Sequence, residues 1–466
     1  MSDTLISTTQ ESVSRTLARW LATVRPGDVP GDVRLAATNT LIDVLGLCLA
    51  ARHADYTRAT LTSWDGRGPC SVIGLPDRLD AAGAALVNGT AAHGEDFDNT
   101  FEGCPVHSGA VVVPAVLAIA EREHLSGERA LLAIAVGLDV MCRLGMVAQK
   151  GVHSAGFHPT AVLGVMAAAA AVGVALGLSE DEFVNTFGVG GSMASGIIEY
   201  LADGSWTKRM HAGWAAHSGI RAVQMGRNGF VGPGTVFEGT HGLFNGFAPS
   251  LKPDFGHLID DLGRHWEAAR LAFKPYACGT MTQPYIDCAI ALRNEGIAPE
   301  DIADMVCDVG EGTVHRLWEP LADKQSPPTP YAAKFSTPYC VAVGLVCGDA
   351  GLAEFTPERL RDPRVLAAAA KVGYRIDPQN EYPRNYSGHI RATLKDGRVV
   401  EKTQATLRGG ERQPLPQEEL IAKFQANARF GGWPDAAATR LLRFALALDQ
   451  VDDVAVLGEV LGDGKA

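Results

Sequence analysis

Apolar residues in the first 250 positions recur at the spacing of an α-helix. Ala, Leu and Val return about every 3.6 residues in six separate stretches. These stretches predict helices over 33–49, 81–92, 111–123, 128–145, 161–176 and 180–195. They are apolar almost all round, which indicates helices buried on several sides. Strand signals are almost absent from this part of the chain, so we expect it to fold as a helical bundle.

Two local signals mark where helices begin. Ser179 followed by Glu182 is a capping box at the start of the sixth stretch. Pro114 is expected in the first turn of its helix, where a missing N–H costs nothing. The stretch 161–178 carries no charge and is long enough to cross a membrane. Ala and Gly dominate it, however, so we favour a close-packed helix at the centre of the helical domain.

The pattern changes after about residue 268. Positions 304–312 alternate like a half-buried strand, and 388–394 and 398–407 flank Asp396-Gly397, a hairpin turn signal. Helices are expected over 339–347 and 362–372, and again in the tail 417–462. The chain is therefore expected to be mainly α. A large all-helical bundle domain, 1–267 and 410–466, would receive a smaller inserted α+β lid, 268–409, with a mostly antiparallel sheet.

Composition narrows the classes of partner. The chain has 466 residues and a net charge of −12, which argues against nucleic acid and anionic membranes as partners. The first ten residues are polar and lack the features of a signal peptide. The nine Cys form no CxxC pair, which is typical of reduced, buried thiols. We therefore expect a cytoplasmic protein, and Cys104 and Cys278 are interpreted as buried thiols.

Titratable residues are dense between positions 93 and 107. The stretch could supply metal ligands, although the HExxH, HxH and EF-hand spacings are missing. We expect no metal, but a metal hydrolase built on this stretch stays open as an alternative. The residues concerned are His93, Glu95, Asp96, Asp98 and His107. Glu95, Asp98 and Glu102 are interpreted as structural.

Other segments carry His and Lys with few acids. "GFHPT" places His158 at the start of a helix, where a neutral imidazole is favoured. "DGSWTKRMHAGWAAHSG" contains Lys208, and "FKPYACG" contains Lys274 at the expected domain junction. A cleft at such a junction is a common ligand site, and these residues would attract di- or tricarboxylates. The glycine-rich segments fit neither a dinucleotide motif nor a P-loop.

Taken together and in this order, these motifs resemble the MmgE/PrpD family. The resemblance also rests on "NGTAAH" at 88–93, "DFDNT" at 96–100, "GPGTVFEGTHGLF" at 232–244 and "AAKFSTPYCVAVGL" at 332–345. It covers nearly the whole chain. It implies a helical domain with a smaller α+β domain, a homodimer, and no organic cofactor or metal. The implied chemistry makes or breaks a bond at the carbon next to a carboxylate of a small polycarboxylate.

The resemblance also implies an active site. Its residues would be Asp96, Thr100, His107, His158, Lys208 and Lys274. Lys208 and Lys274 would bind substrate carboxylates and stabilise the carbanion. His107 and His158 are candidate bases. Asp96 would orient His107 or act as a base, and Thr100 would hydrogen-bond the substrate.

Many members of the family carry His where this chain has Gln283. A dehydratase needs an acid for its leaving hydroxyl, so this departure weakens a dehydratase assignment. Epimerisation of iminodisuccinate is the favoured reaction. Dehydration of the 2-methylcitrate type and cis-aconitate-type decarboxylation are the alternatives, and a non-catalytic dicarboxylate-binding protein is the alternative of a different class.

Overall fold

A computed structural model describes residues 11–462, which form two compact units. The polar first ten residues, on which the expectation about a signal peptide rested, lie outside the described range. Of the described residues, unit 1 contains 11–94, 99–271 and 433–462, and unit 2 contains 95–98 and 272–432. The sequence predicts divisions at 267/268 and 409/410. In the structure, the first of these divisions lies at 271/272 and the second at 432/433.

Unit 1 is helical, as the apolar periodicity predicted. All six predicted helices are present within a few residues of their expected ends. The helices of unit 1 are α1 (Val13–Thr23), α2 (Gly31–Ala51), α3 (Asp55–Thr62), α4 (Ala81–His93), α5 (Gly109–Arg122), α6 (Gly127–Ala148), α7 (Gly151–Ser154), α8 (Pro159–Leu176), α9 (Glu180–Met193), α10 (Tyr200–Asp203), α11 (Thr207–Arg227), α12 (Leu243–Phe247), α13 (Gly256–Ile259), α21 (Asp435–Leu446) and α22 (Leu457–Gly462). Its short strands are β1 (Arg67–Ser71), β2 (Arg78–Leu79), β3 (Thr100–Phe101) and the start of β4 (Leu271–Ala272).

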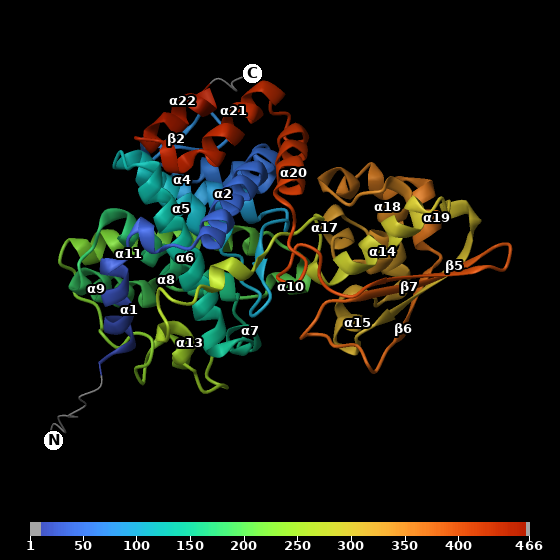
Figure 1. Cartoon of the computed structure of the whole chain (residues 1–466), viewed down its shortest axis with the longest axis horizontal. Helices are drawn as coiled ribbons and strands as arrows, with labels where there is room; N and C mark the ends of the chain where they lie inside the picture. Colours follow the sequence, from blue (N-terminus) through green and yellow to red (C-terminus); the bar gives the residue numbers. More distant parts are fainter. Residues whose placement is uncertain (1–10, 463–466) are drawn as a thin grey trace. The chain divides into compact units, whose positions relative to one another are not determined.

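Helix α8 lies at the centre of unit 1. It contacts α5, α6, α9 and α11, and Figure 1 shows these helices around it. Small residues allow the close approach, because a Cβ at Gly219 of α11 would lie 2.4 Å from the Ala168 Cβ of α8. By length and composition α2, α6 and α8 could each cross a membrane, yet 94% of the apolar window of α8 is buried inside the unit. The charge-free stretch is therefore the packed central helix that its Ala and Gly content predicted.

The start of α5 differs from the prediction. Helix α5 begins at Gly109, so Pro114 lies inside the helix rather than in its first turn. The prediction was wrong because Gly109 and Ala110 carry no strong helix-start signal, whereas Pro114 does. The predicted capping box is confirmed, since the Ser179 hydroxyl accepts from the Glu182 N–H and the Glu182 carboxylate accepts from the Ser179 N–H.

Unit 2 is built on a four-stranded sheet with the order β6-β5-β7-β8. Pairing is antiparallel for β5–β7 and β7–β8 and parallel for β5–β6, which confirms a mostly antiparallel sheet. Residues of α14 and α18 share one buried core with this sheet. The elements are β5 (Ile302–Val309), β6 (Val372–Ile376), β7 (Gly388–Leu394), β8 (Val399–Gln404), α14 (Gln283–Asn294), α15 (Glu311–Leu317), α16 (Leu321–Gln325), α17 (Pro330–Ala333), α18 (Thr337–Cys347), α19 (Pro363–Ala369) and α20 (Gln417–Phe430).

One strand of this sheet was not predicted. The sequence predicted a helix over 362–372, but α19 ends at Ala369 and β6 begins at Val372. The run Ala367–Lys371 favours helix locally, and the parallel pairing of Val372 with Met305 of β5 overrides that preference. The fold class is nevertheless confirmed: the chain is mainly α, and its larger sheet lies in the C-terminal part.

Candidate active site

Four buried histidines gather in unit 1 at the ends of helices. His93 is the last residue of α4, and His107 precedes α5 by two positions. His158 is the N-cap of α8, where its backbone N–H donates to the Gly196 carbonyl. His211 lies in α11. All four are buried.

Two glycines bring the helices of this cluster together. In α4, a Cβ at Gly89 would lie 2.6 Å from the Gly213 Cα of α11. In α11, a Cβ at Gly213 would lie 2.1 Å from the Leu86 carbonyl oxygen. Any side chain at either position would therefore push the two helices apart. This contact places the C-terminal end of α4, which carries His93, beside the first turns of α11.

The imidazole rings are in mutual contact. The centroid of the His93 ring lies 4.8 Å from that of His107 and 5.6 Å from that of His158, against which it is stacked. The His211 ring centroid is 5.3 Å from that of His158. Tyr200 contributes edge-on contacts to both His158 and His211. The site therefore contains several imidazoles whose ring nitrogens can donate or accept a proton.

His158 and His211 form a hydrogen-bonded pair. Their Nδ1 atoms are 3.1 Å apart, so one of them carries the proton and donates it to the other. When His158 is the donor, its Nε2 has a lone pair and can accept a proton. When His211 is the donor, the Nε2 of a neutral His158 carries a hydrogen. The pair thus has two arrangements, one suited to a base and one suited to a proton donor.

Burial keeps this pair uncharged. Burial, together with the nearby charges of His93, Lys208 and other groups, holds the pKa of His158 well below its usual range. Burial lowers the pKa of His211 to about 4, with further contributions from His93 and Lys208. Lys208 is the second residue of α11 and is itself buried. The cluster therefore places a lysine ammonium beside the neutral His158–His211 pair, an arrangement suited to an anionic substrate.

His107 has a defined tautomer. Its Nδ1 lies 3.0 Å from the Asn99 carbonyl oxygen, which can only accept a hydrogen bond. The proton of the neutral ring is therefore on Nδ1, and Nε2 has the lone pair. The Thr160 hydroxyl accepts from the His107 backbone N–H and fixes the residue further. The lone pair on Nε2 is compatible with a base, and that role of His107 stays a prediction.

The depressed pKa of His211 predicts a pH dependence of stability. The unfolded chain binds a proton at His211 near pH 6.5 and the folded chain only near pH 4, so stability falls as pH drops through this window. Between pH 7 and pH 5 this group is expected to remove about 2 kcal/mol of unfolding free energy. In urea unfolding, the free energy of unfolding of His211→Gln should therefore fall by about 2 kcal/mol less than that of the wild type between pH 7 and pH 5. Equal losses in the two proteins would show that His211 is not a buried neutral group.

Unit 2 contains the second group of predicted site residues. Lys274 follows β4, and its side chain is 3% exposed. Its Nζ donates to the Asp96 carbonyl oxygen at 2.7 Å and lies 3.3 Å from the Asp96 Oδ1. An ammonium carries three N–H donors, so these contacts leave one for a substrate oxygen. Asp96 has a φ of 55°, in the left-handed region that non-glycine residues seldom occupy.

Gln283 is held by the loop that follows Lys274. Its Nε2 donates to the carbonyl oxygens of Tyr276 and Cys278 at 3.3 and 3.4 Å. The side chain is buried, and an amide does not titrate. Gln283 therefore shapes the loop and supplies no proton at the position where many family members carry His.

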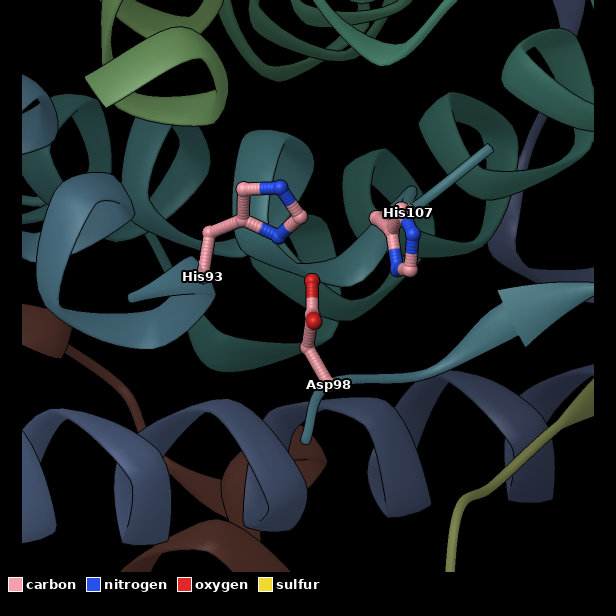
Figure 2. A group of neighbouring side chains, drawn as sticks. All are labelled: His93, Asp98 and His107. Carbon is pink, nitrogen blue, oxygen red and sulfur yellow. The ribbon is translucent and has the colours of Figure 1, made fainter. Parts of the chain in front are cut away.

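Figure 2 shows the residues with the donor types of a metal centre: His93 and His107, with Asp98 just before β3. Two imidazoles and a carboxylate form a donor set that Zn²⁺ or Fe²⁺ accepts. Because the Nδ1 of His107 is bonded to Asn99, an ion at this position would be held through Nε2.

The carboxylates of Glu95 and Asp96 have ammonium partners in unit 2, Lys334 and Lys274 respectively. The pairing of Glu95 agrees with its interpretation as a structural residue.

The structure groups the predicted site residues within each unit. His107, His158 and Lys208 share the cluster of unit 1, and Asp96 and Lys274 are bonded to each other in unit 2. Thr100 is buried in β3. The Cys104 thiol is buried, and burial raises its pKa to about 12, which agrees with an unreactive thiol.

Sequence reasoning did not assign His93 and His211 to the acid–base cluster. Both had a usable signal, because His93 ends the quoted motif "NGTAAH" and His211 follows Lys208 by three residues, on the same helix face. Lys334 and Lys423, which bind the segment around Asp96, were also missed. The sequence of α20 gives no indication that Lys423 is buried, so this residue could not have been identified from the pattern.

Comparison with known proteins places the chain in a family. The model of the MmgE/PrpD N-terminal domain matches residues 15–256, and that of the C-terminal domain matches residues 276–450. The chain is 28% identical to a cis-aconitate decarboxylase-like protein, oryM, of Aspergillus oryzae, over 90% of this chain and 91% of that protein. It is 26% identical to cis-aconitate decarboxylase of Aspergillus terreus, over 98% and 97%. It is 30% identical to cis-aconitate decarboxylase of Mus musculus, over 84% and 80%. These relatives are enzymes, and this chain belongs to the MmgE/PrpD family.

Proposed function

We propose that this protein transfers a proton at the carbon next to a carboxylate of a small polycarboxylate, and that its net reaction is lyase chemistry on an acid of the cis-aconitate type. The observation that carries the proposal is the buried His158–His211 pair, 3.1 Å between Nδ1 atoms, with the charge of Lys208 beside it. In one arrangement of this hydrogen bond the Nε2 of His158 can receive a proton from a substrate carbon, and in the other it carries a hydrogen that it can give. All groups in the proposal belong to this chain.

Positive charge supports the choice of substrate. A carbanion next to a carboxylate carries two negative charges, and a buried ammonium stabilises such an intermediate far better than water does. Lys208 in unit 1 and Lys274 in unit 2 are both buried, as such stabilisation requires. Each of these two ammonium groups could therefore stabilise such an intermediate. Only two residues of chain, Gly94 and Glu95, separate Asp96, the partner of Lys274, from His93 of the histidine cluster.

Decarboxylation is the first candidate because the curated relatives carry that name. In such a step the C–C bond to one carboxylate breaks, carbon dioxide leaves, and the electron pair of the bond stays on the substrate. A proton must then be delivered to carbon. The His158–His211 pair would supply it from Nε2 of His158, and a proton from solvent would then neutralise the negative charge left on the pair. Lys208 would stabilise the charge that develops during the step.

Epimerisation of iminodisuccinate is the second candidate, and Gln283 favours it over dehydration. A hydroxide leaving group needs an acid, whereas the amide of Gln283 is neutral and engaged with backbone carbonyls. An epimerase needs only one group to remove the α-proton and another to return a proton from the opposite face. His107, with its lone pair on Nε2, and the His158–His211 pair would provide these two groups.

Product analysis with three acids distinguishes these reactions. The protein would be incubated with cis-aconitate, 2-methylcitrate and each stereoisomer of iminodisuccinate, followed by chiral chromatography and mass spectrometry. Release of carbon dioxide from cis-aconitate is the expected result. Interconversion of iminodisuccinate stereoisomers without mass change would support the second candidate.

Two further outcomes would contradict the proposal. Binding of an acid with measurable heat, but without turnover or proton exchange, would identify a dicarboxylate-binding protein. Activity that is lost on chelation and restored by a divalent ion would move the chemistry to a metal centre at His93 and His107.

A further inference from the structure

Three consecutive backbone carbonyls in unit 2 each accept a hydrogen bond from a different lysine. The Nζ of Lys334 donates to the Glu95 carbonyl, that of Lys274 to the Asp96 carbonyl and that of Lys423 to the Phe97 carbonyl, each at 2.7 Å. The lysines come from distant parts of the chain: the C-cap of α17, the loop after β4 and the middle of α20. We call this arrangement the lysine clamp. It binds the segment Glu95–Phe97.

The clamp is buried. The exposed fractions of Lys334, Lys274 and Lys423 are 1%, 3% and 8%. A buried ammonium is costly unless hydrogen bonds replace its water, and bonds from a charged donor are the stronger kind. Lys334 also pairs with the Glu95 carboxylate. Because each ammonium is tied to this segment, removal of one would leave a buried carbonyl without its donor.

Lys423 connects the segment to Lys274 itself. Besides the Phe97 carbonyl, its Nζ donates to the Lys274 carbonyl at 3.0 Å, and it lies 3.8 Å from the centroid of the Phe97 ring. One ammonium therefore fixes the backbone on both sides of the Asp96–Lys274 contact. Lys334 fixes the same segment one residue before Asp96.

Two features show why the segment needs such bonds. Asp96 has a φ of 55°, which costs free energy for a residue with a side chain, so its surroundings must hold it there. Phe97, Pro275 and Lys423 also line a cavity of about 430 Å³ in unit 2, together with Arg408 and Asn427. Packing is therefore incomplete beside Phe97. The position of this segment then depends more on its hydrogen bonds than on side-chain packing.

We propose that Lys334 and Lys423 are positioning residues, which hold Asp96 against Lys274 so that both can meet the substrate. This inference rests on the proposed function of Asp96 and Lys274. Neither Lys334 nor Lys423 is assigned contact with the substrate. Neither is among the active-site residues that the family resemblance implies.

The first test needs no activity. Hydrogen exchange would be measured for a peptide covering residues 95–98 in the full-length protein, in Lys423→Met and in Lys334→Met. Methionine keeps the apolar stem and removes the ammonium. Exchange of this peptide is expected to be at least about tenfold faster in both variants. Lys395→Met, an exposed lysine of unit 2, is the matched control and should exchange like the wild type. Unchanged protection in both clamp variants would overturn the proposal.

The second test separates positioning from general stability. In the wild-type background, Lys423→Met is expected to lower kcat/KM about 10- to 100-fold on the acid that the protein turns over. In the Asp96→Asn background the same change should cost less than about threefold, because its effect passes through Asp96. Equal losses in the two backgrounds would overturn the positioning role. If Lys423→Met does not fold, Lys334→Met and Glu95→Gln, which keeps the shape of the carboxylate, are tested in the same two backgrounds.

Failure of the proposed function would look different. A wild-type protein that converts none of the acids would contradict that function, and the exchange measurement alone would then decide whether the clamp holds the segment. Fast exchange in the variants would support the clamp, and unchanged exchange would overturn it.

Discussion

His158→Gln is expected to lower kcat/KM by about 10³, the largest loss of any single substitution in unit 1. Glutamine keeps a polar side chain of similar length but cannot gain or lose a proton. The substitution also ends the Nδ1–Nδ1 hydrogen bond with His211, so the pair can no longer alternate between base and proton donor. The measurement is steady-state turnover of the acid identified by product analysis. KM should change less than kcat, because the charge of Lys208 remains.

His217→Gln provides the matched control. His217 is also in α11 and half-buried, but its ring contacts Trp64 and Trp214 rather than the histidine cluster. Turnover within about twofold of the wild type is expected. If His158→Gln retained near-normal turnover, or if His217→Gln lost as much as His158→Gln, the assignment of acid–base chemistry to this cluster would be wrong.

Lys274→Met is expected to lower kcat/KM by about 10² to 10³, with a rise in KM as well as a fall in kcat. Loss of the ammonium removes a donor for a substrate carboxylate and leaves Asp96 without its ion pair. Lys208→Met is expected to cause a loss of similar size, because its charge stands beside the His158–His211 pair. Both variants would be compared in binding by calorimetry and in turnover.

Lys395→Met again serves as the control for loss of a positive charge. Unfolding by urea would be followed for every variant, since loss of the ion pair between buried Lys274 and Asp96 is expected to cost stability as well. Near-normal turnover in both Lys274→Met and Lys208→Met, with the fold intact, would show that neither ammonium contributes to binding or conversion of an anionic substrate.

The sequence predicted the helical part of the fold well because burial on all sides leaves a strong apolar pattern. Helix α8, from Pro159 to Leu176, is an example. The exposed hairpin turn at Asp396-Gly397 was predicted for another reason, because this dipeptide favours a tight turn. The prediction failed where long-range pairing decides the outcome: β6 follows a helix-favouring Ala run, and only its neighbour β5 makes it a strand. The start of α5 was misplaced for a related reason, since buried Gly109 and Ala110 give no local signal.

The site was predictable in its residue types and less so in its contacts. His107, His158, Lys208, Asp96 and Lys274 came from loop motifs rich in His and Lys, and the resemblance supplied their roles. The Nδ1–Nδ1 bond of His158 depends on α8 and α11 packing through glycines, and no local pattern reveals it. The lysine clamp depends on groups more than 140 residues apart along the chain, for which spacing carries no information.

Solvent deuterium exchange tests the central claim most directly. The protein would be incubated in deuterium oxide with each candidate acid, and deuterium at the carbon next to the carboxylate would be followed by NMR and mass spectrometry. We predict incorporation at that carbon by the wild type, in product or in recovered substrate, and its loss in His158→Gln. Turnover without deuterium at that carbon, or incorporation that His158→Gln leaves unchanged, would contradict the account.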